Sequence, residues 1–220
     1  MFKFLLKEKN SKEIISWSFY DFANQPYTTL IITFIYSAFF VNYIAPNETN
    51  GTFLWANAIS ITAICVGILS PILGAFADSG GYRKFFLIFF TILCSIFTAL
   101  LYIPDSGDVF LALVLVILSN IAYELGTVFS NSYLIDLSNN KNVGRISGTA
   151  WGFGFVGGLI ALFCALTFFD VNIPNDIKLI NIFVAIWFLF FSLPAFFFLK
   201  DRKKEKLLMS NLISVSYTHL

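Results

Sequence analysis

Charged residues are scarce in this sequence of 220 residues, of which only 12% are Asp, Glu, Lys or Arg. A soluble globular domain carries about 25% charged residues, so this composition is poor material for a water-facing surface. The formal net charge of +1 provides no strongly basic face either. We therefore expect no nucleic-acid partner.

Motifs for catalysis and for cofactor binding are also missing. The sequence has no Gly-x-x-x-x-Gly-Lys phosphate loop and no Rossmann fingerprint set between a strand and a helix. Its single histidine, His219, is the penultimate residue, and no Ser-His-Asp set is plausible. Cys65, Cys94 and Cys164 lie inside apolar runs without metal-ligand spacing. The sequence thus predicts no enzyme activity, no cofactor and no metal site.

Long apolar runs dominate the chain, which is 58% hydrophobic with a mean hydropathy of +0.79. A helix needs about 20 mostly apolar residues to cross the hydrocarbon core of a membrane. The sequence therefore predicts an all-α membrane protein with six spans, at about 17–45, 53–77, 85–103, 109–135, 146–169 and 179–199. Residues 1–16 are expected to form a cytoplasmic N-terminal segment, and residues 200–220 a cytoplasmic tail or truncated central linker. The short polar connections indicate that sequential helices are antiparallel neighbours.

The basic residues predict the orientation of these spans. Thirteen of the fourteen Lys and Arg residues fall on one side of the predicted topology, and only Lys178 falls on the other. Because Lys and Arg are enriched in cytoplasmic loops, both termini should be cytoplasmic.

A polar, glycine-rich stretch, GAFADSGGYRK, separates the second and third spans at residues 74–84. It resembles the signature loop of the major facilitator superfamily, Gly-x-Leu-Ala-Asp-Arg-x-Gly-Arg-Lys. The residues that match in register are Gly74, Ala77, Asp78, Gly81 and Arg83, whereas Ser79 and Tyr82 replace usual bases. The resemblance implies a cytoplasmic gate in which Asp78 forms a latch that breaks during transport. We assign to this gating loop Gly74, Asp78, Gly81, Arg83, Lys84, Asp136 and Arg145.

Other stretches resemble the vacuole effluxer-like branch of that superfamily, over about residues 14–200. They comprise Tyr20, Asp21, Phe22, Ala23 and Asn24 in the first span, Phe129, Asn131, Leu134 and Asp136 at the end of the fourth, and Gly144, Arg145, Ser147 and Gly148 entering the fifth. The resemblance implies a secondary transporter, or its N-terminal half of six helices in two three-helix repeats. Such a protein moves a small polar solute, with amino acids among the candidates, by alternating access. It would lie in the vacuolar membrane of a fungus or the plasma (inner) membrane of a bacterium.

Acidic residues at membrane depth are costly and usually face a cavity or a partner. Asp21 lies near the cytoplasmic start of the first span, with Asn24 after it and Pro26 expected to bend the helix. A helix-start acid, stabilised by the N-terminal dipole, is the alternative interpretation of Asp21.

Glu124 lies deeper, in the fourth span, and the spacing of Asn120, Thr127 and Asn131 puts them on the same helix face. We predict that Glu124, and Asp21 as a second candidate, bind substrate or couple protons. Asn24, Asn120, Thr127 and Asn131 complete this predicted site. A structural hydrogen-bonded cluster between helices is the alternative.

Glycines recur along the fifth span, at Gly144, Gly148, Gly152, Gly154, Gly157 and Gly158. Small residues let helix backbones approach closely, so these predict a smooth packing face.

The predicted partners are the lipid bilayer, a small-molecule solute and protons. The superfamily's usual twelve spans also imply a missing C-terminal half or a second copy of this chain. We expect a gene fragment whose ending, SVSYTHL, is partly non-native, or else a natural six-span protein that dimerises. The alternative function is a six-span scaffold or a channel-forming homo-oligomer without coupled transport.

The topology predicts which loops an impermeant thiol reagent can reach. A cysteine introduced by Lys84→Cys should be labelled only from the cytoplasmic side, and one introduced by Ser106→Cys only from outside, because these loops lie on opposite faces. Labelling of intact cells and of inverted vesicles measures this, and the reversed pattern would refute the topology.

Overall fold

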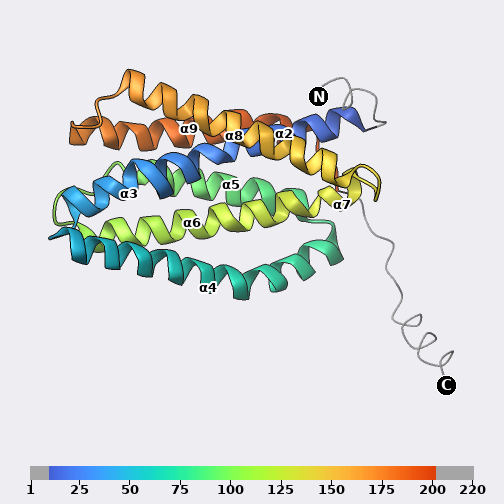
Figure 1. Cartoon of the computed structure of the whole chain (residues 1–220). Helices are drawn as coiled ribbons and strands as arrows, with labels where there is room; N and C mark the ends of the chain where they lie inside the picture. The colour runs from blue at the N-terminus through green and yellow to red at the C-terminus, as the bar shows by residue number, and fades with distance from the viewer. Residues whose placement is uncertain (1–9, 202–220) are drawn as a thin grey trace.

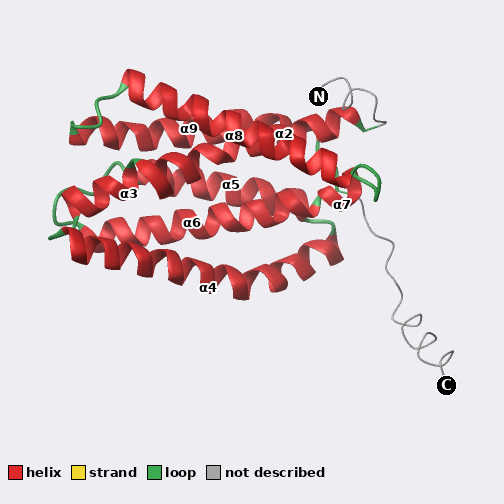
Figure 2. Cartoon of the chain, in the orientation of Figure 1, coloured by secondary structure: helices red, strands yellow, loops and turns green. Residues whose placement is uncertain are grey.

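The computed structural model describes residues 10–201, and the regular elements of that part of the chain are all helical (Figure 2). Six of the helical rods are long and apolar enough to cross a membrane, which confirms the predicted fold class of an all-α, six-helix membrane half. The predictions about residues 1–9, and about the tail and its SVSYTHL ending at 202–220, lie outside the described residues.

The first span is a chain of four helical segments, and the later spans are simpler. The first comprises α2 (Ser11–Pro26), η1 (Tyr27–Phe34), α3 (Tyr36–Phe39) and η2 (Phe40–Ile44). The second and third are α4 (Glu48–Gly80) and α5 (Arg83–Leu100), and the fourth is α6 (Val109–Ser132) followed by α7 (Leu134–Leu137). The fifth and sixth are α8 (Val143–Phe168) and α9 (Pro174–Phe198).

Several helices begin or end beyond the apolar windows from which they were predicted. The first begins at Ser11 rather than near residue 17, and α9 begins at Pro174 rather than near 179. Proline suits the first turn of a helix because its φ is already helical and its missing N–H has no partner there. At its C-terminal end α4 stops at Gly81, whose φ of 69° is left-handed, and the Tyr82 N–H returns to the Ala77 carbonyl at 3.1 Å.

The helices form one bundle in which α4 is peripheral (Figure 1). Helix α2 packs against α8 and α9, α5 packs against α6 and α9, and α4 packs mainly against α6. Only 6% of the most apolar window of α4 is buried within the chain, so most of that helix is free to face lipid or another protein.

The two ends of the bundle differ in charge. The terminal end holds residues 10 and 201 and the α4–α5 and α7–α8 links; the far end holds the links 45–47, 101–108 and 169–173 (Figure 1). The described basic residues lie at the terminal end, except for Lys178 at the far end: Lys12, Arg83, Lys84, Lys141, Arg145 and Lys200. The side of the membrane that the terminal end faces stays a prediction.

Three residues at the far end, Tyr43, Asp105 and Lys178, form a polar cluster that is called the clasp below. Asp105 accepts a hydrogen bond from the Tyr43 hydroxyl at 2.7 Å and pairs with the Lys178 ammonium at 3.0 Å. These contacts, Tyr43 first, hold the pKa of Asp105 at about 2, below its ordinary 3.8. The clasp therefore contributes stability above the ordinary pKa and loses it as the pH falls through about 2.

Proline changes the helix type of the first span. The sequence predicts a bend at Pro26, and the structure shows instead that the α-helix ends there and a π-helix follows. The Ile35 N–H donates to the Leu30 carbonyl, five residues back, at 2.9 Å. Pro26 has no N–H to donate to the Phe22 carbonyl, so one i to i−4 hydrogen bond is missing where the helix type changes, and π-turns frequently mark functional sites.

The glycines of α8 divide into two groups. Gly154, Gly157 and Gly158 pack on the first span, and a methyl group added at Gly157 would overlap the Phe22 carbonyl oxygen. Around Gly144 and Gly148, by contrast, no described atom lies within 4 Å of an added methyl group. The predicted packing face is therefore present at the first three glycines and absent, within the described chain, at the other two.

This division predicts opposite effects of alanine in one helix. Gly157→Ala should destabilise the chain by roughly 1–3 kcal/mol, because the added methyl group overpacks a backbone contact. Gly148→Ala is the matched control and should be neutral or stabilising by up to about 1 kcal/mol, since alanine favours helix. Thermal unfolding in detergent measures both, and equal effects would contradict the assigned packing.

Candidate functional site

A polar hollow of about 310 Å³ lies between the first, fourth and fifth spans. The first span contributes four lining residues, Asp21, Asn24, Gln25 and Thr28, whose helical spacing puts their side chains on one face. The residues that line the hollow are Asp21, Asn24, Gln25, Thr28, Tyr123, Thr127, Asn131, Trp151, Gly154 and Phe155. One carboxylate therefore lies among amides and hydroxyl groups in an otherwise apolar bundle.

Tyrosines of the first and fourth spans hold the wall of this hollow. The Thr28 hydroxyl donates to the Tyr123 hydroxyl at 2.7 Å, and the Tyr27 and Ser119 hydroxyl groups lie 2.8 Å apart. The rings of Tyr27 and Tyr123 stack with centroids 4.8 Å apart. The Thr127 hydroxyl oxygen is buried and has no hydrogen-bond partner within the described part of the chain. The hollow thus has a fixed polar wall, beside which one hydroxyl group is buried without a hydrogen-bond partner in the described part of the chain.

The structure brings together most, but not all, of the predicted site residues. Those that line the hollow are Asp21, Asn24, Thr127 and Asn131. Asn120 is buried with 5% of its surface exposed, and Glu124 is half-buried; neither lines the hollow. Asp21, the second candidate from sequence, is therefore the acid that faces the hollow. The functional roles of all these residues stay predictions.

Three aromatic lining residues were missed by the sequence analysis: Tyr123, Trp151 and Phe155. Aromatic side chains count as apolar in a hydropathy window. The sequence pattern therefore did not distinguish the aromatic residues that line the hollow from those that face lipid or the core. The position of Tyr123 beside Glu124, within the polar stripe of the fourth span, was the available signal.

Three hollows lie end to end along the first and fifth spans. The second, of about 350 Å³, shares Gln25, Thr28 and Phe155 with the polar hollow. The third, of about 500 Å³, shares Phe34 and Leu162 with the second and reaches Asn172 in the far-end link. Together they follow the first and fifth spans from Asp21 toward the far end.

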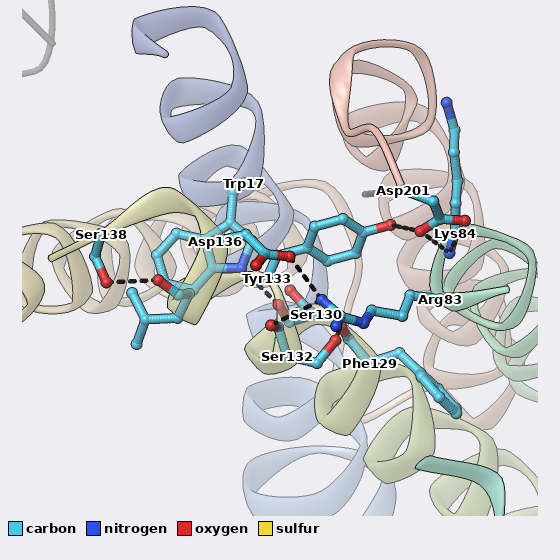
Figure 3. Close-up of polar contacts among 11 residues, drawn as sticks. Trp17, Arg83, Lys84, Phe129, Ser130, Ser132, Tyr133, Asp136, Ser138 and Asp201 are labelled. Atoms are coloured by element: carbon cyan, nitrogen blue, oxygen red, sulfur yellow. Dashed lines mark hydrogen bonds and ion pairs between the residues drawn. The ribbon is translucent and has the colours of Figure 1, made fainter. Parts of the chain in front are cut away.

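The terminal end carries a second polar cluster (Figure 3). The Arg83 guanidinium donates to the Asp136 carboxylate at 2.7 Å, and their side chains are 8% and 20% exposed. Arg83 also reaches the Ser132 carbonyl at 3.5 Å. This pair joins the start of α5 to α7, which follows the fourth span, and it brings together two residues of the predicted gating loop.

Asp201, just after α9, completes the cluster (Figure 3). Its carboxylate accepts a bond from the Lys84 backbone N–H at 3.0 Å and from the Tyr133 hydroxyl at 2.8 Å. A carboxylate is favoured at this position because the first N–H groups of a helix lack intrahelical partners. The third, fourth and sixth spans are thus tied together at one end.

The remaining predicted gating residues lie on α4 and α8. Asp78 is in the last turn of α4, but its side chain lies outside the described part of the structure. Arg145 is in the first turn of α8 and is exposed. Beyond the local helix backbone, no described atom lies within 4 Å of a methyl group added at Gly74, so no neighbouring helix approaches closely there within the described chain.

Residues 41–144, which include the signature loop and the Arg83–Asp136 pair, match the family model described as vacuole effluxer Atg22 like. The chain is 26% identical over 220 residues to the uncharacterized MFS-type transporter YxiO of Bacillus subtilis, covering 94% of this chain and 51% of that protein. The chain is therefore similar to the vacuole effluxer-like branch of the major facilitator superfamily.

The chain is also similar to a protein of another bacterium and to a protein of a yeast. An uncharacterized protein of Aquifex aeolicus is 32% identical over 156 residues, which cover 69% of this chain and 38% of that protein. Autophagy-related protein 22 of Pichia angusta is 26% identical over 190 residues, which cover 74% of this chain and 34% of that protein. The chain therefore spans about half, or less, of the length of the curated relatives it matches.

The Arg83–Asp136 pair can be tested by a double-mutant cycle. Arg83→Ala and Asp136→Ala should each lower stability, and the double variant should lose less than their sum, with a coupling of roughly 1–3 kcal/mol. Lys141→Ala, which removes an exposed base from the same end, is the control and should change little. Additive losses in thermal unfolding would show that the two groups do not stabilise each other.

Proposed function

We propose that this chain is a six-helix half of a secondary transporter that moves a small polar solute across a membrane by alternating access. The observation that carries the proposal is the polar hollow around Asp21, which is the first of three neighbouring hollows along the first and fifth spans. The similarity to the Bacillus subtilis relative, which is named as an MFS-type transporter, supports the same class of function. Both termini are proposed to be cytoplasmic.

The composition of the hollow favours a solute with a cationic group and hydrogen-bonding groups. Asp21 supplies a negative charge, while Asn24, Gln25 and Asn131 supply amides. An amino acid fits this description, since its ammonium complements the carboxylate and its carboxylate can accept bonds from amides and hydroxyl groups. Polar groups at membrane depth usually face a cavity or a partner, which is where these are found.

Alternating access needs a second wall and a gate. The proposed second wall is a C-terminal half or a second copy, facing the open side of the hollow. The proposed gate is the cluster at the terminal end, where Arg83 and Asp136 join the third and fourth spans. Asp78 is proposed as the latch residue, because it lies within the signature loop, in the last turn of α4.

The test uses a complete homologous transporter in proteoliposomes, changed at the positions that align with Asp21 and Glu124. Asp21→Asn should raise the KM for a labelled amino acid roughly tenfold or more, since a lost desolvated charge contact costs about 2 kcal/mol or more. Glu124→Gln should abolish proton-driven uptake but preserve exchange of preloaded solute if Glu124 couples protons. A far-end change, Glu48→Gln, is the control and should leave both measurements unchanged.

These outcomes separate the two acids. If Asp21→Asn leaves the KM of every tested amino acid at the value of the parent transporter, the assignment of the hollow as the solute site is refuted. An unchanged pH profile after Glu124→Gln would leave Glu124 with a structural role only.

A further inference from the structure

The Phe22 carbonyl group lacks the N–H partner it would have in an uninterrupted α-helix. That partner would be residue 26, which is proline and has no N–H. The next N–H along the chain, of Tyr27, goes to the Asn24 carbonyl instead. In a membrane-spanning segment no bulk water is available to replace the missing donor, so another part of the protein must supply it.

The sixth span supplies a donor. The indole N–H of Trp187, on α9, donates to the Phe22 carbonyl at 3.4 Å. The Trp187 ring also stacks on Phe22 with centroids 5.4 Å apart and lies 4.5 Å from the ring of Phe191. Both the donor and the ring of Trp187 are therefore directed at the residue that follows Asp21.

The fifth span reaches the same carbonyl group from its own side. Gly157 packs so closely on the Phe22 carbonyl that a methyl group there would overlap its oxygen. One turn earlier, Gly154 packs on the Asp21 backbone, with 3.3 Å from an added methyl to the Asp21 carbonyl oxygen. Three spans thus meet at the turn that presents Asp21, Asn24 and Gln25 to the hollow.

We infer that Trp187 is a positioning residue, which satisfies the carbonyl freed by Pro26 and thereby fixes the orientation of the hollow-lining turn of the first span. Trp187 does not line the polar hollow itself, so its effect passes through Phe22. The inference gives the sixth span a part in a site built by the first, fourth and fifth. Its relevance to transport rests on the proposed function, whereas the contact itself is testable without transport.

The decisive experiment is a double-mutant cycle on the full chain in detergent. Trp187→Phe keeps an aromatic ring but removes the donor, and should lower the Tm by several degrees. Pro26→Ala restores an N–H four residues after Phe22 and gives the carbonyl a partner within its own helix. In the Pro26→Ala background, Trp187→Phe should therefore have little effect on the Tm.

A matched control distinguishes loss of this donor from loss of any indole. Trp17 donates its N–H to the Ser130 carbonyl at 2.8 Å, which Pro26 does not affect. Trp17→Phe should lower the Tm equally with proline or alanine at position 26. If Trp187→Phe behaves in the same way as Trp17→Phe, the link between Trp187 and Pro26 is refuted.

A second readout reports position rather than stability. Gln25→Cys, in a chain whose Cys65, Cys94 and Cys164 are replaced by serine, places a thiol in the hollow. Trp187→Phe should change its labelling rate by a thiol reagent several-fold when residue 26 is proline, and leave it unchanged when residue 26 is alanine. Equal labelling rates in all four backgrounds would overturn the positioning role. Transport activity enters neither readout, so this failure is distinct from failure of the proposed function.

Discussion

The need to satisfy every backbone N–H and C=O group without water governs this structure. In a membrane, helices meet that need within each span, which is why the described regular structure is helical throughout. The first span departs from regularity at Pro26 and continues as a π-helix. That local irregularity is possible because neighbouring spans approach it closely, with Trp187 as a donor and Gly157 as the contact that leaves room for the carbonyl.

The same irregular region borders the polar hollow. The residues before the proline present a carboxylate and amides, and Thr28, just after it, is held by Tyr123. A regular helix that packed tightly on all sides would leave no depression here. The hydrogen bond that the first span loses at Pro26 therefore lies next to the polar hollow. Trp187 of the sixth span donates to the freed Phe22 carbonyl without lining the hollow itself.

The two ends of the bundle are closed by different chemistry. At the far end Asp105 is held by Tyr43 and Lys178, and its low pKa keeps it charged at any ordinary pH. At the terminal end Arg83, Asp136 and Asp201 tie three spans through contacts that are mostly to helix ends. The ionic contact at the terminal end joins two residues of the predicted gating loop, and for this reason the gate is proposed there rather than at the clasp.

The sequence by itself determined the fold class, because apolar runs of membrane-spanning length leave few alternatives, and its signature loop carries the resemblance to the superfamily. It also predicted that Asp21 and Asn24 share a polar site, since polar groups are costly at that depth, and both line the hollow. Glu124, the acid that the sequence favoured, shares a helix face with Thr127 and Asn131 yet does not line the hollow. Which side chains face one cavity depends on helix rotation and on neighbours distant in the chain, such as Trp151 and Trp187. Only the tertiary structure fixes those, because helical spacing specifies a face but not the partner that the face meets.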